Sequence, residues 1–269
     1  MKHFHGGRVR TSERLAGAKR IVIKVGSSSI TGANEANLDL IVDFVAKQAQ
    51  AGKEVIVVSS GAIATAAPLI GLTVKSEDLA TSQALASIGQ ARLMGRYERS
   101  LDRHGLIPGQ ILLTVDNLDE EQPRMNASRA LERLLEIGVV PIINENDSVA
   151  THEIRFGDND RLASRVSLLA QADLLILLSD VDSLYSKPPG EFGAERIAVV
   201  DQDDDLSHIQ VSGTSTGYGT GGALTKLAAA RYAAEGGVGV ILTATELVES
   251  LTEGNPHHTW FEPVNEAAS

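Results

Sequence analysis

The chain has 269 residues, 43% of them hydrophobic, a formal net charge of −11 and no cysteine. This length and apolar content suffice for a domain with its own core, and the lack of cysteine excludes disulfide staples, thiolate nucleophiles and thiolate metal sites. The negative charge argues against a nucleic-acid partner, because phosphate contacts need clustered Lys and Arg. Any catalytic site has to work without sulfur.

The N-terminal segment is basic and polar. Residues 1–20 carry six Lys or Arg and one Glu, with no apolar stretch long enough for a signal peptide. The longest apolar run elsewhere, residues 174–179, is far shorter than the ~20 residues that a membrane helix needs. We therefore expect residues 1–19 to form a polar, mobile arm and residues 20–269 to form one domain of a cytoplasmic protein, with no membrane partner.

Short apolar runs alternate with helical stretches along the rest of the chain. Six runs rich in β-branched residues predict strands at residues 21–25, 54–60, 109–115, 139–144, 173–179 and 238–244. Helical stretches lie at residues 37–52, 76–105, 126–138, 161–172 and 223–237. This alternation predicts an α/β fold with a mainly parallel central sheet and helices on both faces.

Small, polar and acidic residues follow several of the predicted strands. In parallel sheets, ligands bind at the carboxyl ends of the strands, where loops and helix N-termini gather. The sequence therefore predicts a binding site at this edge, made from residues 26–28, 59–61, 144–147 and 179–180.

A lysine lies inside the first predicted strand. Burying the charge of Lys24 is costly unless a partner pairs with it. Lys24 is therefore either a paired lysine at a binding site or a lysine that reaches solvent from an edge strand. Gly26 lets the backbone approach a ligand closely, and Ser27 adds a hydrogen-bond donor. This turn is a candidate phosphate clamp.

The segment "SSGAIATAA" follows the second strand. Free amides at the start of a helix, together with Ser60, predict an anion site, although an ordinary helix cap fits equally well. It is not a nucleophile elbow, because Val58 and Ala62 stand where that motif needs glycine.

Residues 144–163 form the densest polar segment. Asp158 and Asp160 fit part of a calcium loop, but Leu162 and Ala163 break its pattern. Another acidic cluster, residues 201–205, is interpreted as solvated surface, and the histidines, including His257 and His258, as surface residues without metal-ligand spacing.

Substrate binding is the stronger interpretation of residues 144–163. Asp147 could hold an ammonium group, Asn159 could donate and accept hydrogen bonds, and Asp160 could orient a lysine. Carboxylates alone would repel an anionic ligand, so nearby cations are required. Lys24 and Lys226 are the candidates.

The segment "GTGGALTK", residues 219–226, contains the ingredients of a phosphate loop in an unusual order. A P-loop places its lysine directly after the last glycine, whereas Lys226 comes four residues after Gly222. A flexible Gly-rich turn is the alternative. At the start of a helix, Lys226 would lie about one turn in, within reach of a phosphate bound at the helix N-terminus.

Taken together, the motifs "KVGSSS", "VSSGAIA", "GQARL", "GQILLT", "NENDSVAT", "FGDND", "LLSDVDSLY" and "GTGGALTK" resemble, in this order, the glutamate 5-kinases of the amino acid kinase family. The resemblance runs from about residue 20 to residue 243. It implies a three-layer sandwich of the amino acid kinase type. Many members carry a C-terminal PUA domain, which we do not expect here.

The resemblance also implies roles for the site residues. Lys24, Lys226 and Asp160 would be catalytic, with both lysines on the phosphates. The glutamate site would comprise Ser60, Asp147, Asp158 and Asn159. The ATP site would comprise Lys24, Gly26, Ser27, Ser179, Asp180, Thr220, Gly221, Gly222, Ala223, Leu224, Thr225 and Lys226.

Three positions depart from the family pattern. Ser179 and Ser183 stand where many members have Thr and Gly, and Ala223 replaces a common methionine. These changes could alter the fit of the nucleotide but not the type of reaction.

The activity implied is ATP-dependent phosphorylation of the side-chain carboxylate of L-glutamate, the first step of proline biosynthesis. ATP and Mg²⁺ would be required, without a protein metal site. Proline as feedback inhibitor, glutamyl phosphate reductase as partner and a homo-oligomer are further implications. Another carboxylate kinase of the same fold, or a non-catalytic sensor of nucleotides or amino acids, are the alternatives.

Overall fold

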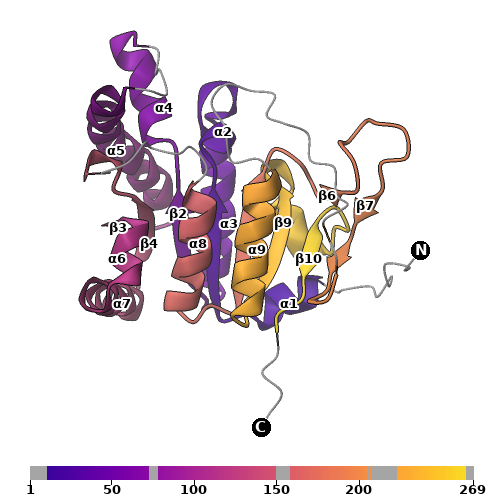
Figure 1. The fold of residues 1–269 in the computed structure, drawn as a ribbon. Helices are drawn as coiled ribbons and strands as arrows, with labels where there is room; N and C mark the ends of the chain where they lie inside the picture. Colours follow the sequence, from indigo (N-terminus) through magenta and orange to yellow (C-terminus); the bar gives the residue numbers. More distant parts are fainter. Residues whose placement is uncertain (1–10, 73–77, 150–157, 205, 207–222, 265–269) are drawn as a thin grey trace.

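A computed structural model of the chain describes residues 11–72, 78–149, 158–204, 206 and 223–264. Within these ranges, eight strands form one sheet in the order β3-β4-β2-β1-β5-β9-β10-β8 (Figure 1). The strands are β1 (Arg20–Val25), β2 (Glu54–Ser59), β3 (Pro108–Leu113), β4 (Val140–Glu145), β5 (Leu174–Ser179), β8 (Val199–Val200), β9 (Gly239–Ala244) and β10 (Thr259–Phe261). The strands β6 (Leu184–Tyr185) and β7 (Arg196–Ile197) form a separate antiparallel pair.

All six expected strands are present and run parallel to their neighbours, from β3 to β9. Their carboxyl ends therefore meet at one edge of the sheet. The short strand β10, which the sequence analysis missed, pairs antiparallel with β9 and parallel with β8. It is only three residues long, too short to show a periodic pattern.

Helices cover both faces of the sheet and make three layers. On one face lie α6 (Val115–Asp119), α7 (Glu121–Glu136), α8 (Asp158–Leu169) and α9 (Ala223–Glu235). On the other lie α1 (Thr11–Gly17), α3 (Asn37–Gln50) and α5 (Leu79–Asp102). At the carboxyl edge lie α2 (Ser27–Ile30) and α4 (Ala62–Ala66), seen at the top of Figure 1. The short 3₁₀ helices are η1 (Gly32–Asn34), η2 (Ala67–Ile70), η3 (Asp147–Val149), η4 (Thr245–Leu247) and η5 (Glu249–Glu253).

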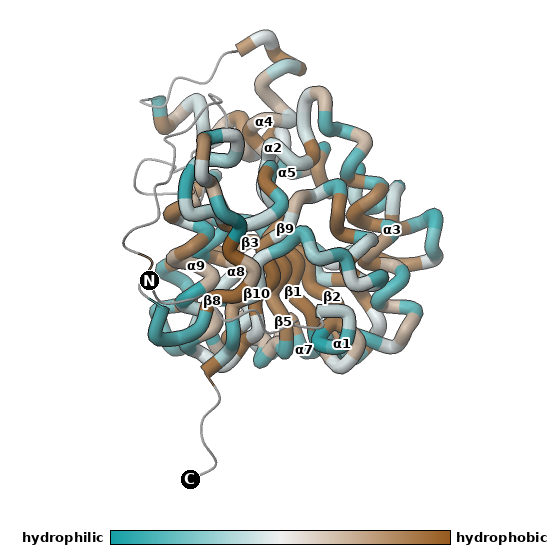
Figure 2. The backbone as a smooth tube through the Cα atoms, turned by 90° about the vertical axis from the view of Figure 1, so that its right-hand side faces the viewer, coloured by the Kyte–Doolittle hydropathy of each residue, from teal (hydrophilic) through white to brown (hydrophobic). Residues whose placement is uncertain are grey.

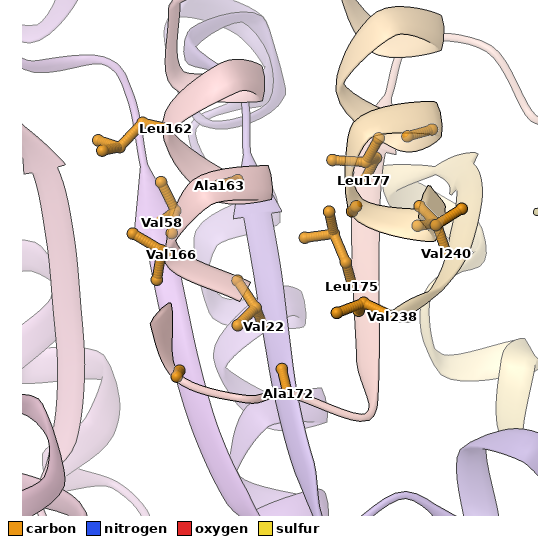
Figure 3. Packing of buried hydrophobic residues seen from close by; sticks show 14 of the residues in the cluster. Val22, Val58, Leu162, Ala163, Val166, Ala172, Leu175, Leu177, Val238 and Val240 are labelled. Carbon is orange, nitrogen blue, oxygen red and sulfur yellow. The ribbon is translucent and has the colours of Figure 1, made fainter. Parts of the chain in front are cut away.

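Successive residues of the central strands face opposite layers, as the two-residue period of a strand requires. Val22 and Val58 pack with Val166 of α8 (Figure 3). Ile23 and Val57 belong to the core on the α3 and α5 side. Strands buried on both faces explain the continuous apolar runs in the sequence, which appear as the brown centre of Figure 2.

Residues 11–19 differ from the polar arm expected there. Residues 11–17 form α1, and Leu15 is only 2% exposed within the core on the α3 and α5 side. Arg14 lies over the ring of Trp260, 5.6 Å from its centroid, and pairs with Glu262 at 2.9 Å. These partners lie near the far end of the chain, so no local sequence pattern could indicate them. Residues 1–10 lie outside the described ranges.

The expectation that His258 is a surface residue is wrong. Its side chain is buried, with Nε2 in contact with the Thr11 hydroxyl and Nδ1 2.9 Å from the carbonyl oxygen of Asn255. Burial lowers the pKa of His258, which favours the neutral ring. His257 is exposed as expected and lies 3.1 Å from Asp182.

Replacing Leu15 by Ala tests whether α1 belongs to the folded domain. Loss of a buried leucine side chain should lower the free energy of unfolding by about 2–4 kcal/mol, measured by urea titration with an unchanged m-value. The matched control Leu69→Ala removes a leucine that is 58% exposed and should cost no more than about 0.5 kcal/mol. Equal losses in the two variants would contradict the packing of α1.

Candidate functional site

A buried carboxylate between two lysines lies at the carboxyl edge of the sheet. Lys24 shares the strand face of Val22 and therefore points toward α8, where its Nζ is 2.6 Å from Asp160 Oδ1. From α9, Lys226 Nζ lies 3.4 Å from Asp160 Oδ2, and the Thr225 hydroxyl donates to the same oxygen at 3.2 Å. The three charged side chains, which we call the Lys–Asp–Lys cluster, join β1, α8 and α9.

Two of the three charges of the Lys–Asp–Lys cluster are almost fully removed from water. Asp160 is 0% exposed and Lys24 is 3% exposed, whereas the Lys226 side chain is partly buried, with 14% exposed. Burial raises the pKa of the Asp160 carboxyl, but the charges and hydrogen bonds of Lys24 and Lys226 outweigh burial and leave this pKa below its ordinary value. Burial, together with the like charge of Lys24, lowers the pKa of Lys226 despite the opposing effect of Asp160. Two cations and one anion leave a net positive charge for an anionic ligand.

The turn after β1 is fixed to the ends of two other strands. The Ser28 hydroxyl donates to Asp180 Oδ1 at 2.9 Å, just beyond the end of β5. The Thr245 hydroxyl, just beyond β9, donates to Ser29 Oγ at 2.9 Å. At Gly26, an added Cβ would lie 3.6 Å from Lys24 Nζ, in ordinary van der Waals contact with the amine. The backbone of this turn therefore runs close to Lys24.

The turn after β2 contacts the start of α8. Asn159 Nδ2 lies 2.6 Å from Ser60 Oγ, 3.1 Å from the Ser59 carbonyl oxygen and 2.9 Å from Asn144 Oδ1. From the opposite layer, the buried Tyr97 donates its hydroxyl to Ser59 Oγ at 2.9 Å. Burial raises the pKa of Tyr97 to about 12, so the phenol stays a donor. Both layers therefore hold this turn.

A pocket of about 330 Å³ opens beside this turn, between α5 and the ends of β3 and β4. Its lining includes Ala62, Gln90, Gln110, Glu145 and Asp147. The α4 backbone reaches the pocket because α5 carries a glycine at the crossing: an added Cβ at residue 89 would lie 1.7 Å from the Ala62 carbonyl oxygen. A small apolar space with acidic side chains suits a ligand that carries an ammonium group.

The structure brings together most of the residues selected from the sequence. Lys24, Asp160, Lys226 and Thr225 meet directly, as described above. Ser60 contacts Asn159, Asp147 lines the pocket, Ser179 is buried at the end of β5, and Asp180 holds the turn that contains Gly26 and Ser27. Asp158 is the first residue of α8, while Ala223 and the exposed Leu224 begin α9. Thr220, Gly221 and Gly222 lie outside the described residues.

Sequence reasoning missed the residues that support the site from α5. Gly89, Gln90 and Tyr97 all contact the turns or strand ends around the pocket, and Arg96 donates to the carbonyl oxygens of Ile30 and Glu35 at 2.9 and 3.0 Å. Gly89 and Gln90 stand in the "GQARL" motif. That motif contributes to the family resemblance, but it does not indicate which groups these residues contact.

No group of three or more His, Cys, Asp or Glu side chains within the described residues could hold a metal ion. In the same part of the chain, no helix combines the length and apolarity needed to cross a membrane.

Residues 19–243 match the family model described as the amino acid kinase family. A glutamate 5-kinase of Leifsonia xyli subsp. xyli is 55% identical over 256 residues, which cover 95% of this chain and 95% of that protein. A glutamate 5-kinase of Clavibacter michiganensis subsp. michiganensis is also 55% identical, over 93% of this chain and 96% of that protein. The structure of carbamate kinase from Giardia lamblia bound to AMP-PNP aligns with a TM-score of 0.66 at 13% identity, covering 92% of this chain and 99% of that chain. At this identity the alignment shows the shared fold.

The variant Asp160→Asn should lower the free energy of unfolding by about 3 kcal/mol at neutral pH, because two buried ammonium groups lose their counter-charge. The folded pKa of Asp160 lies below its ordinary value of 3.8, so its contribution is fully present above that pH and is lost as the pH falls through the folded pKa. Urea titrations should therefore show a constant difference from the unaltered protein between about pH 5 and 8, which shrinks in stronger acid.

The exposed Asp102, at the end of α5, provides the control for this charge change. Asp102→Asn should change the free energy of unfolding by less than about 0.5 kcal/mol. A loss in Asp160→Asn no larger than in this control would show that the ion pairs do not stabilise the fold.

Proposed function

The chain belongs to the amino acid kinase family, and we propose that it phosphorylates the side-chain carboxylate of L-glutamate with ATP, giving L-glutamyl 5-phosphate for proline biosynthesis. The observation that carries this proposal is the Lys–Asp–Lys cluster, which places two cations at the same edge of the sheet as the pocket lined by Asp147. Two relatives that cover nearly the whole chain at 55% identity, both glutamate 5-kinases, support the choice of substrate.

We assign the ATP phosphates to the space bounded by the turn after β1 and the start of α9. Lys24 and Lys226 approach this space from opposite sides, with Asp160 between them. Gly26 and Ser27 would offer backbone and hydroxyl groups to the phosphates. The remaining ATP contacts would come from residues 179–180 and 220–225, and the last residues of that segment start α9, whose N-terminal end favours anions through the helix dipole.

Glutamate is assigned to the pocket beside Asp147. Its ammonium group would pair with Asp147, with Asp158 and Asn159 nearby at the start of α8. Asn159 Oδ1 is buried and has no hydrogen-bond partner among the described residues, as expected of an acceptor kept for a ligand. Ser60 would donate to the carboxylate that is phosphorylated. This arrangement directs that carboxylate toward the lysines.

The chemistry requires charge stabilisation but no general base. A glutamate side chain with an ordinary pKa near ~4.3 is already ionised at neutral pH and can attack the γ-phosphoryl group directly. The obstacle is the approach of one anion to another, and charge also spreads over the transferring group. Lysine ammonium groups held by Asp160 stabilise this charge without rearranging during the reaction.

Magnesium fits this site as an ion carried by the nucleotide. The carboxylate of Asp160 is already engaged by two lysines, and Mg²⁺ in kinases is commonly bound by phosphates with few protein carboxylates. When bound, the ion supplies further positive charge to the β- and γ-phosphates.

We extend the proposal to the cellular setting that the glutamate 5-kinases suggest. This includes a cytoplasmic homo-oligomer, feedback inhibition by proline and transfer of the product to glutamyl phosphate reductase. An acyl phosphate hydrolyses readily in water, which favours prompt consumption by the next enzyme.

A hydroxylamine trap tests the proposed reaction. Protein, MgATP, L-glutamate and hydroxylamine should give the γ-glutamyl hydroxamate, because hydroxylamine displaces phosphate from the acyl phosphate. Aspartate and N-acetylglutamate, tested under the same conditions, should give at least tenfold less product. A preference for either would indicate a sister kinase, and bound ATP without any hydroxamate would indicate a non-catalytic sensor.

Replacing Lys226 by Met should lower kcat by about 10²-fold or more, because the lysine stabilises charge that develops in the transition state. The KM for glutamate should change less than about threefold. Steady-state kinetics of this variant, and of Lys24→Met, check the expectation. The exposed Lys47 provides the matched control, Lys47→Met, which should keep ordinary turnover. Ordinary turnover in either site variant would remove that lysine from the mechanism.

A further inference from the structure

Four side-chain amides form a continuous chain of hydrogen bonds from α8 to the edge of the sheet. Asn159 Nδ2 donates to Asn144 Oδ1 at 2.9 Å, and Asn144 Nδ2 donates to Gln90 Oε1 at 2.7 Å. Gln90 Nε2 then donates to Gln110 Oε1 at 3.1 Å. We call this the amide chain. It joins α8, β4, α5 and β3, and its last two members line the pocket.

Backbone groups fix the direction of the amide chain. The Ser59 carbonyl oxygen can only accept, so the side of Asn159 that faces it must be Nδ2. The Glu145 backbone N–H can only donate, and it donates to Asn144 Oδ1 at 2.8 Å. Asn144 must therefore donate from Nδ2 to Gln90, and Gln90 must accept this hydrogen bond with its carbonyl oxygen. The orientation of every amide in the chain follows from these two contacts.

The direction of the amide chain decides which atom of Asn159 faces a ligand. With Nδ2 committed to the protein, Oδ1 is the atom that stays buried without a partner in the described part of the chain. An acceptor in that position selects a donor such as an ammonium group. If Asn159 turned over, a donor would replace this acceptor and repel the same ligand.

We propose that Gln90 is a positioning residue that keeps Asn159 Oδ1 available for the amino group of the substrate, an inference that rests on the proposed function. Asn144 is only 2% exposed, so losing its acceptor on Gln90 would leave a buried N–H unsatisfied. Asn144 can relieve this penalty by turning its side chain toward another acceptor. It would then no longer accept from Asn159 Nδ2, which would keep the Ser59 carbonyl oxygen and Ser60 Oγ but lose its third partner, so Asn159 Oδ1 would be held less firmly in its position.

The variant Gln90→Met tests the proposal, because methionine keeps the length and volume of the side chain and removes both polar groups. Two ligands separate positioning from general damage: L-glutamate, and glutarate, which lacks only the amino group. In the unaltered enzyme, glutarate should act as a weak competitive inhibitor against glutamate. In Gln90→Met, the KM for glutamate should rise about tenfold, while the inhibition constant of glutarate and the KM for ATP change less than about twofold.

A second variant and a matched control complete the experiment. Gln110→Met keeps the Gln90 carbonyl oxygen that accepts from Asn144 and removes only the Gln110 oxygen that accepts from Gln90 Nε2. The KM for glutamate should therefore rise by about two- to threefold. Gln50→Met makes the same substitution at an exposed position on α3 and should leave all constants unchanged.

The outcomes distinguish this inference from the proposed function. If the unaltered enzyme phosphorylates glutamate but Gln90→Met keeps its KM, the positioning role is overturned and the function stands. Equal losses for glutamate and glutarate would also overturn it, because they indicate damage to the pocket as a whole. If Gln90→Met fails to fold, an unchanged glutamate KM in Gln110→Met decides against the amide chain. Without glutamate phosphorylation by the unaltered enzyme, the proposed function itself fails.

Discussion

A buried carboxylate held between two ammonium groups is the constraint on which the rest of the site depends. Removing charged groups from water destabilises the folded state unless each charge keeps its partners. Asp160 meets this condition by giving one oxygen to Lys24 and the other to Lys226. The arrangement fixes the ends of β1, α8 and α9 relative to one another. It also leaves one positive charge in excess, which suits an anionic ligand.

The helix α5 supports the site from the other side of the sheet. Four of its side-chain positions reach different parts of the site: Gly89 admits the Ala62 carbonyl, Gln90 holds the amide chain, Arg96 binds the carbonyls around α2, and Tyr97 fixes the turn after β2. One rigid helix thus supports both the turn assigned to phosphate and the pocket assigned to glutamate. Small shifts of α5 would change both sides of the site together.

The sequence predicted the parallel sheet and its strands because strands buried on both faces leave continuous apolar runs. It also predicted a binding site at the carboxyl edge of the sheet, because a lysine inside an apolar run and polar residues at strand ends are visible in the local sequence. The pairing of Lys24 and Lys226 with Asp160 followed from the need for cations and from the family resemblance. Asp160 lies 136 residues after Lys24 and 66 residues before Lys226, and no periodicity encodes these contacts.

Other features could not be predicted for the same reason. Leu15 and His258 looked like surface positions because their partners lie in distant segments, and only the folded chain brings them together. Gly89 is an ordinary helix residue in the sequence, and its meaning appears only where the Ala62 carbonyl approaches it. Long-range packing therefore accounts for most of what sequence reasoning missed.

A crystal structure with a non-hydrolysable ATP analogue, Mg²⁺ and L-glutamate tests the central claim most directly. The account predicts that the Nζ atoms of Lys24 and Lys226 both lie within about 3 Å of phosphate oxygens, with Asp160 still between them. It also predicts that the glutamate side-chain carboxylate points at the γ-phosphate. Either lysine turned away from the phosphates, or glutamate bound outside the pocket beside Asp147, would contradict it.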